Sequence, residues 1–450
     1  MNRTIRIASL FSLVLVFILL VNLTWVQVFR TDELADNPLN RRQFYRAQMI
    51  ARGPITAGGE VLAHSEKQED GTYKRSYGES APLYGPTIGY LDPQFGAAGL
   101  EASQNDVLNG ENTVKLTVDP KLQKAAYQGL ASRGYEGAAV AIKASTGEIL
   151  AIASTPSYNP ATATDNWDSL SNDEMSPLLN HATQDSLPPG STFKVITTAA
   201  ALMNGYAPGS PLTGAPQITL PGTTATLENY GGSACAGGGT VTLTTAFALS
   251  CNTAFAQLGS QLTDEQLTKT AQAFGVGETY DLGLPESAGA LGDLTDAAAR
   301  AQSAIGQRDV SMTALQNAVV AATVANDGLR MKPYIVSEVL GRDLKVKHKT
   351  TPTEAAEVMP KEVSDQIAEL MRASERSTLG YQGGAIASKT GTAEHGEDSR
   401  NSDPHGWYIA FEGDVAVAVV VKNGGDQGAR AVGATTAAPI GREILGAARG

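Results

Sequence analysis

The sequence predicts an α+β fold in which an antiparallel sheet is flanked by helices. Strand-like segments occur at 137–153 and again at 385–421, and helical periodicity dominates the residues between them. An uncharged segment of 23 residues, 7–29, lies near the N-terminus. We therefore expect a sheet assembled from two distant parts of the chain, preceded by one transmembrane helix and a small β-rich module.

The composition excludes several classes of protein. The chain has 450 residues, more than the ~100–200 of a typical domain, so two or three folded units are expected. Its 34 Lys and Arg residues against 46 Asp and Glu residues give a net charge of −12, which repels nucleic acids. The two cysteines and five histidines form neither a Cys-x-x-Cys nor a His-Glu-x-x-His pair. We expect no nucleic-acid partner, no metal and no cofactor.

The segment 7–29 is long enough, as a helix, to cross a hydrocarbon core of ~30 Å. Arg3 and Arg6 precede it, so the positive-inside rule places residues 1–6 in the cytoplasm and the rest of the chain outside. A cleaved signal peptide is the alternative, but the segment exceeds the usual ~7–15 residue signal core and lacks a small-x-small cleavage site. We expect a single-pass anchor in the cell membrane, with Trp25 at the outer interface.

Two modules follow the anchor. Residues 30–117 are polar with short alternating segments, which predicts a small, elongated module of strands and coil. The pattern changes at Asp119 and Pro120, where an N-cap residue and a proline at the first helical position predict a helix over 120–130. A larger domain is therefore expected over 118–450.

The larger domain begins and ends with predicted strands. Residues 137–142 and 148–153 are apolar runs joined by a Gly-containing turn, a pattern typical of a β-hairpin. From about 191 to 370 the pattern is mainly helical. The other expected elements are helices at 191–204, 264–274 and 311–325, strands at 385–392, 407–411 and 415–421, and a final helix at 439–448.

Ser191 and Lys194 form the first candidate chemical motif, Ser-x-x-Lys. Positions i and i+3 share one face of a helix, so the lysine amine can approach the serine hydroxyl. A serine needs such a base, and lysine can serve when burial or a neighbouring cation disfavours its charge. The motif alone is weak, because a capping serine beside a solvated lysine also matches it. We expect Lys194 to be partly exposed at the helix start.

The second candidate is the Ser-x-Asn motif of Ser250 and Asn252. It ends an apolar helical stretch at 243–249, and three other Ser-x-Asn triplets occur in the chain. Only this triplet lies between the first motif and the third, so its position selects it.

The third candidate lies on the predicted strand 385–392. Lys389, Thr390 and Thr392 offer a cation and two hydroxyls to a bound carboxylate, and Gly391 permits close backbone approach. A lysine that keeps an edge strand soluble would explain Lys389 about as well. The three motifs together, in this order, are far more specific than any one of them, and penicillin-binding proteins and class A β-lactamases share the set.

On these motifs the chain resembles a class B penicillin-binding protein, a membrane-anchored peptidoglycan D,D-transpeptidase, and most closely the short form of that family. The resemblance covers nearly all of the chain after the anchor. It implies a serine transpeptidase domain of β-lactamase-like fold at 118–450 and a pedestal, similar to a dimerisation domain, at 30–117. Matching stretches lie at 52–56, 99–101, 146–151, 188–194, 250–255, 305–307 and 389–394.

The resemblance implies the chemistry of the first two motifs. Ser191 would be acylated by the penultimate D-Ala carbonyl of a stem peptide that ends in D-Ala-D-Ala, with Lys194 as general base. Ser250 would relay the proton to the leaving D-Ala, and Asn252 would hold the peptide amide. An amine from a neighbouring stem would then accept the acyl group, and β-lactams would acylate the same serine.

The third motif would bind the substrate. Lys389, Thr390 and Thr392 would hold the terminal carboxylate, and Gly391 would let the backbone approach it. The backbone N–H groups of Ser191 and Thr392 would stabilise the oxyanion of the tetrahedral intermediate. Because such a transpeptidase makes no glycan, a separate membrane glycan polymerase is an implied partner, in contact with the anchor and pedestal.

Three related functions are alternatives. A class A β-lactamase needs a Glu-x-x-x-Asn element between the second and third motifs to activate water, and the sequence has none in that interval. A non-catalytic β-lactam sensor needs a cytoplasmic output domain, which we do not expect from residues 1–6. A D,D-carboxypeptidase uses the same acyl-enzyme and differs only in its acceptor, so this alternative stays open.

Cys235 and Cys251 are the two cysteines of the chain, and the second lies inside the Ser-x-Asn motif. The anchor topology places both outside the membrane, where disulfides persist. A bridge between them would hold the Gly-rich segment 236–239 beside Ser250 and Asn252. Two free buried thiols are the alternative.

Overall fold

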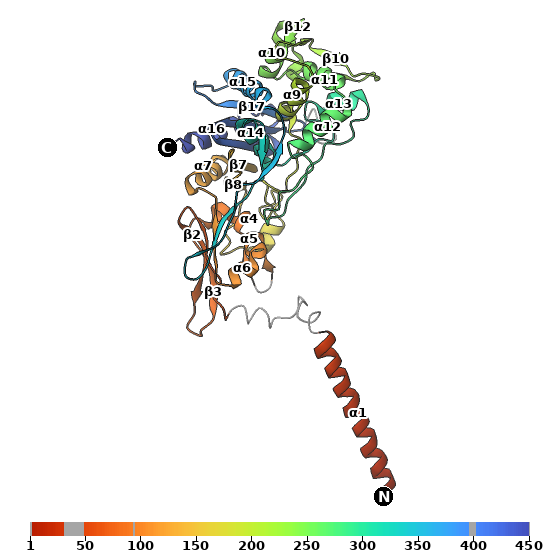
Figure 1. The fold of residues 1–450 in the computed structure, drawn as a ribbon, viewed down its shortest axis with the longest axis vertical. Coiled ribbons are helices and arrows are strands. Elements are labelled where there is room, and N and C mark those ends of the chain that lie inside the picture. Colours follow the sequence, from red (N-terminus) through yellow and green to blue (C-terminus); the bar gives the residue numbers. More distant parts are fainter. Residues whose placement is uncertain (1, 31–48, 93–94, 396–401, 450) are drawn as a thin grey trace. The chain divides into compact units, whose positions relative to one another are not determined.

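The computed structural model describes residues 2–30, 49–92, 95–395 and 402–449 (Figure 1). The first part of the predicted pedestal, residues 31–48, lies outside the described residues. The helices and strands are labelled in Figure 1 in chain order.

Helix α1 (Asn2–Phe29) contains the predicted membrane segment and most of the predicted stub 1–6. Over Ile5–Val28 it is long and apolar enough to cross a membrane. Its described side chains are almost all exposed, which is unfavourable for apolar groups in water. The helix is therefore a candidate membrane anchor.

The pedestal contains a six-stranded sheet with the order β15-β14-β6-β1-β2-β3. Strand β1 runs antiparallel to β2 and parallel to β6. Short helical segments and one strand pair lie between β3 and β6 in the chain. The helical segments are η1 (Ala81–Tyr84), α4 (Gly85–Ile88), α5 (Gly99–Ser103) and α6 (Asn105–Asn109), and the paired strands are β4 (Leu91–Asp92) and β5 (Gly96–Ala97). The sheet strands are β1 (Ile55–Ala57), β2 (Glu60–Lys67), β3 (Tyr73–Tyr77), β6 (Thr113–Leu116), β14 (Val336–Leu340) and β15 (Val346–Lys349).

Two of these strands come from the part of the chain that we expected to be mainly helical. Strand β14 pairs with β6, with Val339 opposite Val114, and β15 pairs with β14. The segment 30–117 therefore does not make this sheet alone. The expectation of helix failed here because β14 and β15 are short, and because the pairing of β14 depends on residues far away in the sequence.

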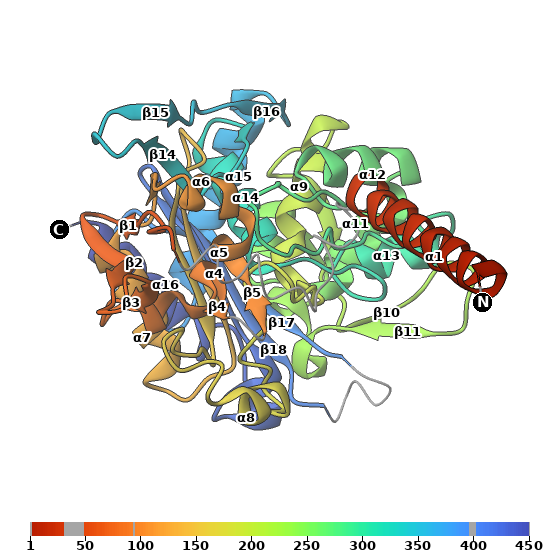
Figure 2. The same cartoon turned by 90° about the horizontal axis from the view of Figure 1, so that it is seen from below.

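The second sheet has five antiparallel strands in the order β17-β18-β19-β7-β8, of which β17 and β18 are labelled side by side in Figure 2. The first two strands of the domain form the expected hairpin, and the last three add to it, so the predicted sheet from two distant parts of the chain is confirmed. Its strands are β7 (Gly137–Lys143), β8 (Ile149–Thr155), β17 (Ala387–Ala393), β18 (His405–Glu412) and β19 (Val415–Val421).

Helices cover both faces of this sheet. Helices α7 (Pro120–Ala131) and α16 (Ala437–Ala448) pack on one face, and α14 (Ala314–Ala325) packs on the other. Two separate apolar cores lie on the two sides, one containing Val419 and the other Val420. Alternate residues of a strand point to opposite faces, so β19 contributes to both cores.

The helices predicted at 191–204, 264–274 and 311–325 are present with ends shifted by a few residues, whereas the helices at 167–171, 252–261 and 297–303 had not been predicted individually. Capping boxes begin α12 at Thr263 and α14 at Thr313, and the Asp119 side chain accepts hydrogen bonds at the start of α7. The remaining helices are α8 (Trp167–Ser171), η2 (Gly190–Phe193), α9 (Lys194–Met203), α10 (Leu243–Ala248), α11 (Asn252–Gln261), α12 (Asp264–Ala273), α13 (Ala297–Ser303) and α15 (Lys361–Ser377). The small strands are β9 (Pro211–Thr213), β10 (Gln217–Thr219), β11 (Thr226–Glu228), β12 (Thr240–Thr242), β13 (Leu329–Met331) and β16 (Glu354–Glu357).

Candidate active site

Ser191 lies in the short 3₁₀ turn η2, immediately before helix α9, which begins at Lys194. Gly190 has φ +55°, a conformation that favours glycine, so the turn can form at this position. The Ser191 side chain is half-buried. Lys194 is 0 % exposed, so our expectation of a partly exposed lysine was wrong. Lys194 is buried by elements from distant parts of the chain, which the local sequence pattern does not indicate.

The Lys194 amine reaches the second motif. Its Nζ donates to the Ser250 carbonyl at 2.7 Å and to Asn252 Oδ1 at 2.8 Å, and it lies 3.3 Å from Ser250 Oγ. Among the described residues the Ser191 hydroxyl makes no hydrogen bond to this amine. Catalytic hydrogen bonds are often incomplete before substrate binds.

Ser250 occupies a sharp turn between α10 and α11. Its φ is +60°, which is uncommon for a residue other than glycine. This turn allows both its carbonyl oxygen and its hydroxyl to face Lys194. The Ser-x-Asn motif therefore contributes through the backbone conformation at Ser250 as well as through its two side chains.

The amine of Lys389 also contacts the Ser250 hydroxyl. Lys389 lies on the edge strand β17, and its Nζ donates to Ser250 Oγ at 2.8 Å and to the Thr390 carbonyl at 3.0 Å. Lys389 is 0 % exposed, so a role in keeping the edge strand soluble does not fit. The structure thus brings Lys194, Ser250, Asn252 and Lys389 together.

Both amines are less basic than ordinary lysines. Burial, and secondarily the nearby Lys389 cation, hold the pKa of Lys194 well below its usual range. Burial lowers the pKa of Lys389 to about 7. Within the described residues, no carboxylate oxygen lies within 4.0 Å of either amine. The site therefore favours neutral Lys194, the form that can accept a proton.

The rest of the third motif lies beside the serine turn. A Cβ atom at Gly391 would be 2.7 Å from the Pro189 carbonyl oxygen, so only glycine fits there. Thr390 and Thr392 are half-buried, and the Thr392 hydroxyl accepts a hydrogen bond from the Gly433 N–H at 3.4 Å. The strand β17 therefore runs directly against the segment that carries Ser191.

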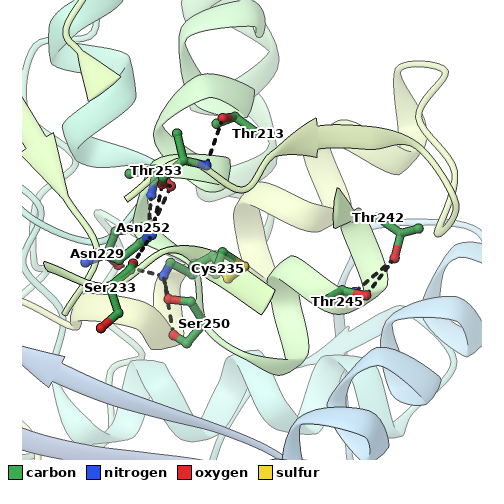
Figure 3. The surroundings of a disulfide bond; sticks show 12 residues. Thr213, Asn229, Ser233, Cys235, Thr242, Thr245, Ser250, Asn252 and Thr253 are labelled. Atoms are coloured by element: carbon green, nitrogen blue, oxygen red, sulfur yellow. Dashed lines mark hydrogen bonds between the residues drawn. A yellow bond between two sulfur atoms is a disulfide. The ribbon is translucent and has the colours of Figure 1, made fainter. Parts of the chain in front are cut away.

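A disulfide joins Cys235 and Cys251, with Cα atoms 5.8 Å apart (Figure 3). It connects the Gly-rich loop after β11 to the turn that bears Ser250. A bridge of this kind restricts the turn that presents the Ser250 hydroxyl.

Asn229 and Thr253 support the same turn, and sequence reasoning missed them. The Asn229 Oδ1 accepts from the Thr253 N–H at 3.0 Å and from its hydroxyl at 3.2 Å. Asn252 Nδ2 donates to the Glu228 carbonyl at 3.4 Å. Asn229 lies in none of the stretches that matched the family, and Thr253 lies in the matching stretch 250–255 but received no role.

One acidic cluster elsewhere has metal-ligand chemistry. Glu136, His181 and Asp185 place ligand atoms within 4.8 Å of one another. However, the Lys422 amine lies 2.5 Å from Glu136 and 2.8 Å from Asp185. The Lys422 ammonium thus already pairs with both carboxylates of this cluster.

Two family models match the chain. The penicillin-binding protein transpeptidase domain matches residues 137–446, and the penicillin-binding protein A dimerisation domain matches residues 52–128. The second match overlaps the region 30–117, which we expected to resemble a dimerisation domain.

Curated relatives and solved structures agree. The chain is 43% identical to the peptidoglycan D,D-transpeptidase PbpA of Mycolicibacterium smegmatis, covering 100% of this chain and 99% of the relative. It is 40% identical to PbpA of Mycobacterium tuberculosis, with the same coverage. The penicillin G acyl-enzyme complex of penicillin-binding protein A from M. tuberculosis superimposes with a TM-score of 0.85 at 39% identity, covering 89% of this chain and 100% of that one. The chain therefore belongs to the penicillin-binding protein transpeptidases.

Proposed function

We propose that this chain is a peptidoglycan D,D-transpeptidase that cross-links stem peptides through an acyl-enzyme on Ser191, releases the terminal D-Ala and is acylated by β-lactams. The observation that carries the proposal is the pair of buried amines, Lys194 and Lys389, on one hydroxyl, Ser250 Oγ. The relatives named as peptidoglycan D,D-transpeptidases and the acyl-enzyme structures support it.

In the first half-reaction, neutral Lys194 takes the proton of the Ser191 hydroxyl as its oxygen attacks the penultimate D-Ala carbonyl. The N–H groups of Ser191 and Thr392 stabilise the oxyanion. Collapse of the intermediate breaks the peptide bond, and the proton passes from Lys194 through Ser250 Oγ to the departing D-Ala amine. The 3.3 Å separation of Lys194 Nζ and Ser250 Oγ suits this relay.

Substrate binding uses the third motif. Protonated Lys389, with the hydroxyls of Thr390 and Thr392, holds the terminal carboxylate by charge-assisted hydrogen bonds, while Gly391 keeps the strand close to the serine turn. Asn252 holds the peptide amide of the stem. An acceptor amine from a second stem then attacks the acyl carbonyl, the ester bond to Ser191 Oγ breaks, and the proton lost by the amine returns to the serine hydroxyl. Water as acceptor would instead give a D,D-carboxypeptidase.

The chain is proposed to act outside the cytoplasm. Residues 1–6 would form a cytoplasmic stub, 7–29 the anchor in the cell membrane, 30–117 the pedestal and 118–450 the transpeptidase domain. Strands β14 and β15 extend the pedestal sheet, so they would move with the pedestal. A separate membrane glycan polymerase would supply the glycan strands and contact the anchor and pedestal.

The test is intact mass after incubation with penicillin G. The wild-type chain should gain one penicilloyl mass, mapped to the peptide that contains Ser191, and Ser191→Ala should gain none. Ser186→Ala is the matched control, because this nearby buried hydroxyl has no hydrogen-bond partner among the described residues. An adduct on Ser191→Ala would disprove the nucleophile assignment. A crosslinked product from two stem peptides, rather than a shortened stem alone, would separate transfer from hydrolysis.

A further inference from the structure

Trp407 is fully buried on strand β18, and it contacts the segment that leads into Ser191. Its indole Nε1 donates a hydrogen bond to the Pro188 carbonyl at 2.9 Å. On the neighbouring strand β17, the residue opposite Trp407 is Gly391. Trp407 therefore links the substrate-binding strand pair to the residues just before the nucleophile.

The two prolines before Ser191 can be held only through their carbonyl groups and ring packing. Pro188 and Pro189 have no backbone N–H, so they cannot donate a hydrogen bond. Their carbonyl oxygens are the polar atoms available: the Pro189 oxygen accepts a hydrogen bond from the Thr192 hydroxyl at 2.9 Å, and the half-buried Pro188 accepts the one from Trp407. The indole N–H is a donor only, which makes it a suitable partner for the Pro188 oxygen.

The next peptide units pack directly on β17. A Cβ atom at Gly190 would lie 2.8 Å from the Thr392 carbonyl oxygen, and the Gly190 N–H donates to the Gly306 carbonyl at 2.9 Å. This close backbone packing limits how far the two segments can move apart, but it does not fix their relative orientation. The hydrogen bond from Trp407 is directional, so it also orients the Pro188 peptide group at the start of the turn.

We propose that Trp407 is a positioning residue that fixes the serine turn against β17 and so sets the separation of the two oxyanion donors, the N–H groups of Ser191 and Thr392. This inference rests on the proposed function, because it assumes that Ser191 is acylated. It concerns the acylation step only. Within the described residues Trp407 makes no hydrogen bond to Lys194 or Lys389, so the protonation of the amines should not depend on it.

The test compares Trp407→Phe with wild type in the full-length chain. With a chromogenic β-lactam, the acylation rate constant should fall roughly tenfold or more, because small misplacements of reacting groups cost up to about a hundredfold. The non-covalent dissociation constant should stay within about twofold, and the midpoints of the pH–rate profile should not move. If Trp407 only stabilised the fold, its replacement would not lower the acylation rate constant while leaving the dissociation constant and the pH–rate midpoints unchanged.

Tyr408→Phe is the matched control. Tyr408 is buried on the same strand, and its hydroxyl donates to Glu375 Oε2 at 3.0 Å rather than toward the serine turn. This variant should lower thermal stability and leave the acylation rate constant within about twofold. A second replacement, benzothienylalanine at position 407, keeps the ring size and removes only the N–H, so it answers the question even if Trp407→Phe folds poorly.

The outcomes are distinct. Slow acylation in both Trp407 replacements, with a normal rate in Tyr408→Phe, supports the positioning role. A wild-type rate in the benzothienylalanine variant, or equal losses in Tyr408→Phe, would overturn it. Peptide mapping of the wild-type adduct is measured alongside: a label away from Ser191 would reject the proposed function itself, whereas a label on Ser191 with unaffected rates would reject only the role of Trp407.

Discussion

Two regions of this molecule bury cations in opposite ways. In the pedestal, Arg52 donates to Glu101 Oε2 at 3.0 Å and to the side-chain oxygens of Asn105 and Asn109 at 2.8 and 2.7 Å. At the candidate active site, Lys194 and Lys389 are equally buried, and within the described residues no carboxylate lies within 4.0 Å of their amines. The pedestal cation is paired with an acid, whereas among the described residues the two lysine amines contact neutral oxygens and lie over the rings of Phe255 and Phe247.

The difference explains their chemistry. A buried ion pair keeps both groups charged, and breaking it leaves one uncompensated charge in the interior. A buried amine without an acid loses its proton more easily, which is the state a general base needs. The same degree of burial therefore serves stability in one region and reactivity in the other.

Removing the active-site base should have the largest effect. We expect Lys194→Met to lower the acylation rate by ~10²- to 10⁴-fold, the usual contribution of a general base, without lowering thermal stability, because the variant no longer buries an amine. Acylation by a fluorescent penicillin and thermal unfolding would be measured together. Lys269→Met, at an exposed lysine, is the control. Wild-type acylation in Lys194→Met would exclude the general-base role.

Removing the pedestal cation should do the reverse. We expect Arg52→Met to lower the free energy of unfolding by ~3–5 kcal/mol, since the buried Glu101 loses the guanidinium of Arg52, while the folded fraction acylates at the wild-type rate. Arg342→Met breaks the exposed pair with Glu111 and should cost less than ~1 kcal/mol. Denaturant unfolding followed by circular dichroism measures both. Equal losses in the two variants would contradict the comparison.

Lys389→Met tests whether the two lysines influence each other. It should weaken substrates that carry a terminal carboxylate by roughly 10- to 100-fold, the range of a charge-assisted hydrogen bond. Because Lys389 lowers the pKa of Lys194, its removal should raise that pKa, and the acid limb of the pH–rate profile should move to higher pH.

The pH–rate profile with a carboxylate-free ester substrate isolates the second effect. In the wild type, binding of a carboxylate substrate to the free enzyme should weaken as pH rises through about 7, where Lys389 loses its proton. If the acid limb does not move in Lys389→Met, Lys389 does not lower the pKa of Lys194, and its role is substrate binding only.

The disulfide should have the smallest effect on rate. Cys235 and Cys251 are 16 residues apart, and closing a loop of this length stabilises by up to ~3 kcal/mol in the chain-entropy model. We expect Cys235→Ala/Cys251→Ala to lower the unfolding free energy by up to that amount and the acylation rate by only a few-fold. A thiol reductant should reproduce both changes in the wild type and leave the double variant unchanged. Equal sensitivity of both proteins to reductant would exclude the bridge as the cause.

Much of the fold could be read from local signals. The start of α7 at Pro120, the hairpin of β7 and β8, and the three C-terminal strands all lie close to their predicted positions, because caps, turns and alternation act over a few residues. Strands β14 and β15 could not be predicted in the pedestal sheet. Their partner β6 is far away in the sequence, and pairing over such distances leaves no local pattern.

The sequence by itself determined which residues have the chemistry of a penicillin-binding transpeptidase, since Ser191, Lys194, Ser250, Asn252 and Lys389 all stand in its ordered motifs. Only the tertiary structure decided their state. It buried Lys194 where the local pattern predicted exposure, and it set the amine of Lys389 against Ser250 Oγ. Proton affinity depends on the groups and the solvent around an atom, and these come from segments that meet only when the chain folds.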